Sequence, residues 1–347
     1  MATMTDVARR AGVSVSTVSY ALNGTRPISE ATRQRIFAAI DELGYKPHAL
    51  ARGLASKRSR LIALLLPASE RGLGYTELEF VTSAAMAAKE NQYSLVLWSY
   101  DVHDLDDLQQ LIQQRLVDGV IVMEVHERDE RIGLLRSLEF PFSMIGRCVD
   151  ADDLDYVDID FAQTIRDAVD HLIGLGHRRI AFLHQSQAAY TAGYGPVIRT
   201  QAGFEETMQA HRLEAVSRFC RTAPHAGYEA FRALLERHPD LTGLITMNER
   251  AVPGILQAIH ECGWMLPDDF SLVVIVSSGS VAEMMMPPLT TFEAMTTEMG
   301  RLGVELLVQQ LDRSRPEPSH ILLPCRLVVR CSAGPAPDSA RPAAQFS

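Results

Sequence analysis

Residues 61–276 carry two sets of short apolar runs, each separated from the next by a stretch with helical spacing. The runs lie at 61–66, 94–98, 119–123 and 142–145, and again near 179–183, 215–220, 243–247 and 271–276. Strands that are apolar throughout and alternate with helices indicate parallel sheets covered on both faces. The pattern therefore predicts two doubly wound α/β subdomains, with a ligand cleft at the carboxyl ends of their strands.

The first 45 residues show a different pattern, in which apolar positions recur at helical spacing over three short segments. We expect a first helix that Thr5 caps, a second that Ser14 caps and a third that Ser29 caps. Gly12 permits a sharp turn between the first two. Two short helices joined by a tight turn form a helix-turn-helix, whose second helix enters the major groove of DNA. The chain is thus predicted to join an all-α helix-turn-helix head to an α/β core.

Charge is distributed unevenly along the 347 residues. The net charge of −10 alone argues against nucleic acid, but residues 1–60 carry ten Lys or Arg and only four Asp or Glu. The head is therefore +6 and the remainder −16. A basic head on an acidic body indicates a module for a polyanion joined to a module with another partner. The alternative is a solvated basic face on a small helical domain.

Several classes of protein find no support in the sequence. No apolar run reaches the ~18 residues that span a membrane, and the N-terminus lacks the apolar core of a secretory signal. We therefore expect a cytoplasmic protein with no membrane partner. The five cysteines include no Cys-x-x-Cys pair, and neither a dinucleotide fingerprint nor a phosphate-binding loop occurs. We expect no metal and no cofactor.

A dense motif runs through the first fifty residues. It reads Asp-Val-Ala-Arg-Arg-Ala-Gly-Val-Ser at 6–14, Thr-Val-Ser at 17–19 and Leu-Asn-Gly at 22–24, and continues through Thr32-Arg33, Gly44-Tyr45, Pro47, Ala51-Arg52 and Leu54. This head resembles that of the LacI/GalR family of bacterial transcriptional regulators. The resemblance implies a repressor-like protein with a core similar to a periplasmic sugar-binding protein.

The resemblance also implies roles for single residues of the head. Bases in the major groove would be read by Val15, Ser16 and Tyr20. Phosphates would be held by Thr5, Thr17, Ser19 and Asn23, contacts that set the register without reading sequence. Ser14 belongs to the same surface, because a cap hydroxyl at a helix N-terminus lies beside an anion site. The alternatives are that Thr5 and Ser14 act only as caps and that Val15 is merely exposed.

Residues 48–60 are predicted to form a hinge helix and linker between the head, 1–47, and the core, 61–332. A helix of two turns is marginal in water by itself, so it would order only on binding. In the family, a hinge leucine wedges into the minor groove, and Leu54 occupies that position. The alternative is that Leu54 packs on the core.

The core also carries motifs that resemble the family. They include His-Leu-Ile at 171–173, Leu-Gly-His-Arg-Arg-Ile-Ala-Phe at 175–182, Asn248-Glu249, and Pro-Pro-Leu-Thr-Thr at 287–291. Because the family core crosses between its halves, we expect a first subdomain of about 61–158 and 292–317. The second would comprise about 159–289 and 318–332. Residues 333–347, rich in Ala, Pro and Ser, are predicted to be a disordered tail.

The predicted ligand cleft departs from the family pattern. The family commonly places a carboxylate at the end of the last strand of the second half, where this chain reads Val-Ile-Val-Ser at 274–277. Its usual ligand arginine is replaced by Thr200, beside Arg199. The candidate effector-binding residues, chosen by their positions at strand ends, are Tyr75, Arg147, Asp160, Tyr194, Arg199, Asn248, Glu249, Ser277 and Ser278. The alternatives are a salt bridge across the cleft for Arg147 and Asp160, and a helix cap for Asn248.

Together these features predict a sequence-specific DNA-binding transcriptional regulator. It would be a repressor that binds a pseudo-palindromic double-stranded operator as a homodimer. A small-molecule effector, a sugar or sugar derivative, would act by binding the DNA-bound and free states unequally. The alternative is a regulator that answers to a protein partner or to no effector. An enzyme is not expected, because no catalytic spacing occurs, and the DNA-binding head argues against a periplasmic binding protein.

Overall fold

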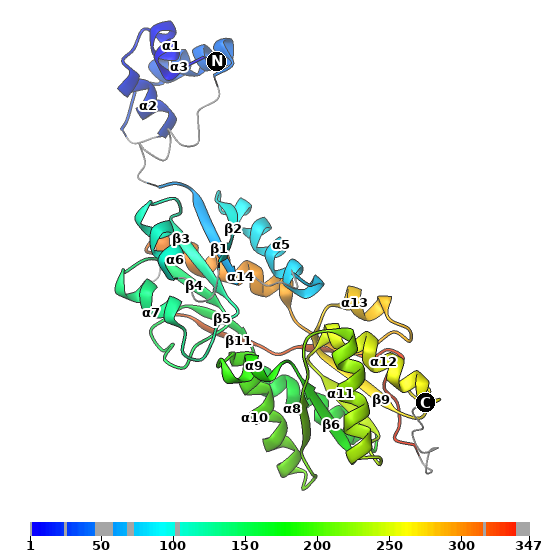
Figure 1. Ribbon diagram of the computed structural model, residues 1–347. Helices are drawn as coiled ribbons and strands as arrows, with labels where there is room; N and C mark the ends of the chain where they lie inside the picture. Colours follow the sequence, from blue (N-terminus) through cyan, green and yellow to red (C-terminus); the bar gives the residue numbers. More distant parts are fainter. Residues whose placement is uncertain are drawn as a thin grey trace.

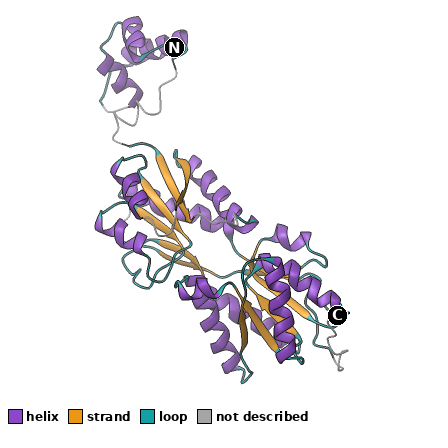
Figure 2. Ribbon diagram, in the orientation of Figure 1, coloured by secondary structure: helices purple, strands orange, loops and turns teal. Residues whose placement is uncertain are grey.

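The computed structural model describes residues 2–23, 26–45, 58–67, 73–100, 105–314 and 317–337 (Figure 1). They form a three-helix head and two α/β subdomains, each with one six-stranded sheet between layers of helices (Figure 2). This confirms the predicted fold class. Among the described residues, none of the helices is both long and apolar enough to cross a membrane.

The head consists of α1 (Met4–Ala11), α2 (Val15–Asn23) and α3 (Glu30–Leu43). Val7, Val18 and Ile36, one from each helix, are fully buried and form the centre of its small core. Gly12 has a φ of +67° at the turn between α1 and α2, a conformation that glycine adopts without strain. The helix-turn-helix therefore rests on the apolar spacing that predicted it.

The caps of the head helices agree with the predictions in two of three cases. Ser14 Oγ accepts a hydrogen bond from the backbone N–H of Thr17 at 3.1 Å, and Ser29 caps α3. The prediction that Thr5 caps α1 is wrong. Thr3 caps that helix in a reciprocal pair with Asp6, because its hydroxyl is the one three residues before an acidic side chain. Thr5 is an exposed residue of the first turn.

The first subdomain is built on a sheet whose strands are all parallel, in the order β11-β5-β4-β3-β1-β2. These strands are β1 (Leu61–Pro67), β2 (Ser94–Tyr100), β3 (Gly119–Met123), β4 (Phe142–Ile145), β5 (Tyr156–Ile159) and β11 (His320–Leu323). One face packs on α5 (Tyr75–Glu90) and α14 (Thr296–Leu311). The other packs on α6 (Leu105–Gln113) and α7 (Glu130–Ser137).

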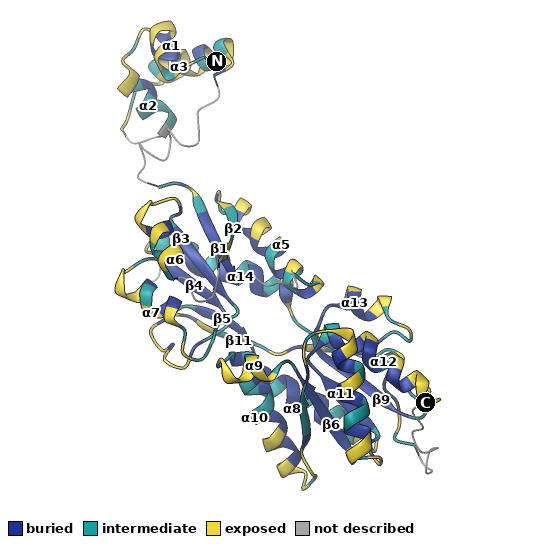
Figure 3. Ribbon diagram, in the orientation of Figure 1, coloured by how far each residue is buried: buried dark blue, intermediate teal, exposed yellow. Residues whose placement is uncertain are grey.

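The second subdomain repeats this plan with strand order β12-β10-β9-β8-β6-β7. Its strands are β6 (Ile180–His184), β7 (Val216–Phe219), β8 (Gly243–Thr246), β9 (Ser271–Ser277), β10 (Thr290–Glu293) and β12 (Arg326–Val328). Its helices are α8 (Phe161–Gly174), α9 (Gln187–Thr191), α10 (Gly195–Ala210), α11 (Pro224–Arg237), the 3₁₀ turn η1 (Glu249–Ala251), α12 (Val252–Glu261) and α13 (Gly279–Met284). Figure 3 shows that the strands of both sheets are mostly buried.

The chain passes between the subdomains three times, and the expected boundaries need two corrections. β10 pairs with β9 in the second sheet, although residues 292 and 293 were expected in the first subdomain. β11 pairs with β5 in the first sheet, although 318–332 was assigned to the second. β12 is antiparallel to β10, so the second sheet is mixed rather than wholly parallel. The strands at the last two crossings, β10 and β11, are short. Local periodicity does not show to which sheet such a short strand belongs.

The beginning of the predicted disordered tail is packed against the second subdomain. The carbonyl of Gly334 lies 3.0 Å from His177 Nε2, and the N–H of Ala336 donates to the carbonyl of Leu175 at 2.8 Å. The prediction of disorder is therefore wrong for residues 333–337. The rest of the predicted tail, 338–347, lies outside the described residues.

Candidate functional site: an interdomain cleft and a helix-turn-helix surface

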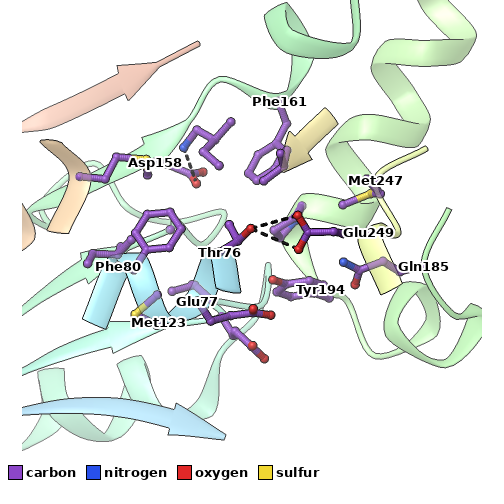
Figure 4. Close-up of a pocket in the computed structure, with 18 of the residues that line it drawn as sticks. Thr76, Glu77, Phe80, Met123, Asp158, Phe161, Gln185, Tyr194, Met247 and Glu249 are labelled. Atoms are coloured by element: carbon purple, nitrogen blue, oxygen red, sulfur yellow. Dashed lines mark hydrogen bonds between the residues drawn. The ribbon is translucent and has the colours of Figure 1, made fainter. Parts of the chain in front are cut away.

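A cavity of about 140 Å³ lies between the two subdomains, at the carboxyl ends of their strands. From the first subdomain its wall includes the first turn of α5 and the ends of β3, β4 and β5. From the second it includes the segment before α10, the start of η1 and the end of β9. Figure 4 shows side chains from both halves around this space. The volume suits a small molecule rather than a peptide.

Glu249 is the acidic residue that links the two walls of the cavity. One carboxylate oxygen accepts hydrogen bonds from Ser277 Oγ at 2.6 Å and from the backbone N–H of Ser278 at 3.1 Å. The other accepts from Thr76 Oγ1, on the first subdomain, at 3.3 Å (Figure 4). Burial raises the pKa of Glu249 above its ordinary value. A carboxylate thus stands beside the end of β9, where the strand itself supplies none.

A second acidic residue, Asp158 at the end of β5, is enclosed at the cavity wall. It is only 3% exposed. One of its oxygens lies 3.3 Å from Arg199 Nη1 and 3.4 Å from Arg147 Nε. Burial raises the pKa of Asp158 to about 6, and the two guanidinium groups oppose the rise. Arg199 also donates to the carbonyl of Arg147 at 2.7 Å, so it ties α10 to the first subdomain.

This arrangement differs from the expectation for Asp160. The acidic partner of Arg147 is Asp158, and Asp160 instead accepts a hydrogen bond from the N–H of Gln163 at 2.9 Å as the cap of α8. Asp160 therefore does not line the cavity. Arg147 and Arg199 are likewise absent from its wall and contact Asp158, which does line it.

The remaining candidates are also divided by the structure. Tyr194 and Asn248 line the cavity. Asn248 is almost fully buried, and its Nδ2 donates to the carbonyl of Cys220 at 3.1 Å rather than capping η1. Ser277 and Ser278 stand behind the wall, where they hydrogen-bond to acidic residues. Tyr75 does not line the cavity and is 56% exposed.

Several residues of the cavity wall were not predicted. They are Thr76, Glu77, Phe80, Met123, Glu124, Val125, Ile145, Gly146, Asp158, Ile159, Phe161, Gln185, Pro196, Thr222, Met247, Arg250, Val276 and Met299. Asp158 stands two positions before Asp160, so the alternation of a strand could have identified it. Val276 has a φ of +57°, rare for a β-branched residue, where the pairing of β9 with β10 shifts register. No local signal in the sequence marks that bulge.

Hydroxyl groups gather at the exposed N-terminal end of α2. Ser14 Oγ lies 2.7 Å from Ser16 Oγ and 2.8 Å from Thr17 Oγ1. Val15 is 43% exposed although it is apolar. Tyr20 is half-buried, with the guanidinium of Arg26 5.2 Å from the centre of its ring. Short polar groups at a helix N-terminus can hold phosphates or reach base edges.

The other expected DNA-contacting residues are placed less fully. Ser19 is half-buried on α2, and Thr5 is exposed on α1. The side chain of Asn23 and the whole of Leu54 lie outside the described residues. Their roles, and every contact with DNA, stay predictions.

A helix-turn-helix head joined to two α/β subdomains around a small-molecule cavity defines a class of ligand-binding gene regulators. Residues 3–48 match the family described as bacterial regulatory proteins, lacI family, and residues 169–333 match the periplasmic binding protein-like domain. The chain is 30% identical to the ribose operon repressor of Escherichia coli (strain K12), over 96% of this chain and 100% of the repressor. It is 31% identical to the HTH-type transcriptional regulator CelR of Thermobifida fusca, over 94% and 97%. The chain belongs to the LacI family of bacterial regulatory proteins.

Solved structures show the same architecture. The complex of the regulator CelR with cellobiose matches with a TM-score of 0.72 and 28% identity, over 96% of this chain and 100% of that one. The lac repressor dimer bound to operator matches with a TM-score of 0.82 and 24% identity, over 96% and 99%. At that identity the second likeness concerns the fold alone.

Proposed function

We propose that this protein is a transcriptional repressor that binds a pseudo-palindromic DNA operator as a homodimer and releases or retains it according to a small molecule in the interdomain cleft. The observation that carries the proposal is the joining of an exposed, hydroxyl-rich α2 to a core with a cavity between its subdomains. Relatives that span nearly the whole chain include a ribose operon repressor. A structural neighbour is a regulator in complex with cellobiose, which supports a carbohydrate-related effector.

In the operator complex, α2 lies in the major groove. Val15, Ser16 and Tyr20 contact base edges, and the exposed methyl groups of Val15 suit a thymine methyl. Thr5, Ser14, Thr17, Ser19 and Asn23 hold phosphates, which fix the register. Leu54 wedges into the minor groove at the centre of the operator, where the two hinges meet.

The dimer forms through an apolar face on one side of the core. Tyr75, Leu78 and Met86 are 56%, 46% and 62% exposed along α5. Leu97, on the neighbouring edge strand β2, is 46% exposed, and Met286, beyond α13, is 86% exposed. In Figure 1, α5, β2 and α13 lie along the same side of the molecule. An exposed apolar face shared by both subdomains fits a second copy of the chain.

Charged substitution of this face tests the dimer. Replacing Leu78 and Met86 with arginine should convert the protein to a monomer in analytical ultracentrifugation, because two buried charges in each copy would face an apolar surface. Arginine at Leu116, which is 43% exposed outside the proposed face, is the control and should leave a dimer. A double variant that still sediments as a dimer would exclude this face.

The cleft gives the effector control over the operator. A ligand between the subdomains binds differently to the open and closed arrangements, and a difference of about 1–3 kcal/mol changes operator affinity about 5- to 150-fold. Tyr194, Asn248 and Glu249 contact the ligand directly. Ser277 and Ser278 act through the acidic residues that they hold, and Arg147 and Arg199 act through Asp158.

Selection of operators from a random pool of DNA duplexes tests the proposal. The full chain should enrich an inverted repeat whose half-sites are about one helical turn apart, or a multiple of that. Recovery of single half-sites would overturn the dimer, and recovery of no shared sequence at a stated salt concentration would overturn specific recognition.

A further inference from the structure

Acidic residues outnumber basic residues on the cavity wall. Four acidic residues line the cavity, namely Glu77, Glu124, Asp158 and Glu249, and Arg250 is the one Lys or Arg on this wall in the part of the chain that the structure describes. Asp158 is already neutralised by Arg147 and Arg199, which contact it from outside the cavity. Apart from Asp158, three acidic residues and one arginine line the cavity, so its wall carries an excess of negative charge and favours a positively charged ligand.

Two of these carboxylates come from opposite subdomains. Glu77 lies on the first turn of α5, and Glu249 begins η1. Figure 4 shows Glu77, Glu249 and Tyr194 around the same part of the cavity. Besides burial, the negative charge of Glu77 raises the pKa of Glu249. Like charges therefore face one another across the cleft, and a cation between them would relieve this repulsion.

A buried acceptor points to the same ligand chemistry. Asn248 lines the cavity and is 1% exposed. Its Nδ2 is directed to the backbone carbonyls of His184, Cys220 and Arg221, which fixes the orientation of the amide. Its Oδ1 has no partner among the described residues. A buried oxygen without a donor is destabilising, so a ligand that brings an N–H group to it gains affinity.

The cation that this wall favours is an organic group rather than a metal ion. No group of three or more acidic, histidine or cysteine residues is arranged to hold a metal ion in the described ranges. Instead, Phe80, Phe161 and Tyr194 supply aromatic surface to the wall. Aromatic faces beside carboxylates are a favourable setting for an alkylammonium group.

We infer that the effector carries a protonated primary amine, held between Glu77 and Glu249 as the cleft closes. Thr222 and Gln185 also lie on the wall, where their side chains can hydrogen-bond to oxygen atoms of the ligand. The ligand class is a small polar amine, such as an amino sugar or amino alcohol, rather than a neutral sugar. The inference rests on the proposed role of this cleft as the effector site.

Matched pairs of compounds test the inference with the full-length protein. Thermal-shift assays followed by calorimetry would compare D-glucosamine with D-glucose, and 1,4-diaminobutane and 4-amino-1-butanol with 1,4-butanediol. At least one amine should bind about tenfold or more tightly than its hydroxyl counterpart, because hydrogen bonds to charged groups are stronger. Glu77→Gln and Glu249→Gln should each remove that preference. Glu90→Gln, at the exposed C-terminal end of α5, should leave it unchanged.

The possible results separate the inference from the proposed function. Equal or tighter binding of the hydroxyl compounds would overturn the amine and leave the effector cleft intact. An amine preference that persists in Glu77→Gln and Glu249→Gln would also overturn the inference. If no compound of either kind binds, the amine is overturned, whereas operator selection still tests the proposed function separately.

Discussion

A hydrogen bond across the cleft offers a direct way to disturb the closed arrangement. Ser278 Oγ, after β9, donates to Glu79 Oε1 on α5 at 2.5 Å. Glu79 also accepts a hydrogen bond from Thr296 Oγ1, at the start of α14, at 3.0 Å. It therefore links α5 and α14 of the first subdomain to Ser278 of the second. Ser278→Gly removes the hydroxyl. Glycine is nearly as good a cap for α13 as serine, so the loss of capping adds only a few tenths of a kcal/mol.

The size of the effect follows from the chemistry of this bond. A hydrogen bond to a charged group contributes about 1.5–3 kcal/mol. Loss of the bond should therefore shift the equilibrium between closed and open forms about 10- to 150-fold toward the open form. Since effector binding requires closure in our account, the apparent affinity for a cleft ligand should fall as the closed population falls.

Distances between spin labels would report the shift. Cys331 is exposed on the second subdomain and the other four cysteines are buried, so one added cysteine at the exposed Ser137 on α7 completes a pair. Double electron–electron resonance should show the open distance gaining population in Ser278→Gly. Ser186→Gly, which removes the capping hydroxyl of α9 in the same way, is the control and should leave the distribution unchanged. An unchanged distribution in Ser278→Gly would refute the role of this bond.

Three further changes test other parts of the account. Gly254→Ala should lower the melting temperature strongly, because its Cβ would lie 1.7 Å from the carbonyl oxygen of Pro224. Gly133→Ala, on α7, would meet no atom within 4 Å and should raise the melting temperature, because alanine favours a helix more than glycine does. Equal effects of the two substitutions would contradict this packing. Burial lowers the pKa of His184 to about 3, below the ordinary 6.5, so the folded state resists protonation and stability is lost as pH falls from 6.5 toward 3. In urea unfolding, the parent protein should lose about 1 kcal/mol more stability between pH 6.5 and 5.5 than His184→Phe does, and a variant with the same pH dependence as the parent would contradict this role. Ser16→Ala should weaken operator binding by about 1–3 kcal/mol and relax specificity at one base pair, measured by fluorescence anisotropy; a uniform loss across sequences would instead make Ser16 a phosphate contact.

The fold could be read from the sequence because its signals are local. Apolar runs of strand length and helical spacing are set within ten residues, and they predicted the strands around which both sheets formed. The sheet to which β10 and β11 belong depends on their pairing with other strands. The partner of β11 lies more than a hundred residues earlier in the sequence. Local periodicity does not carry that information, which is why the subdomain boundaries required correction.

The cavity wall was harder to predict than the fold. The position of Asp160 after a strand suggested a place in the cavity, but Asp160 lies just beyond β5 and its carboxylate caps α8, whereas Asp158, within β5, lines the cavity. Glu249 reaches the end of β9 from a different element, so the carboxylate missing from the strand is supplied by a residue 28 positions earlier than Ser277. Such convergence becomes visible only when the elements are assembled.

We propose that the cleft and the DNA-binding head act on one another. Footprinting of the full chain on its selected operator, with and without the compound that stabilises it most, tests this claim directly. We predict symmetric protection of two half-sites and a change of about 5- to 150-fold in the protein concentration that half-protects them. Protection of a single half-site, or the same half-protecting concentration with the compound bound, would contradict the account.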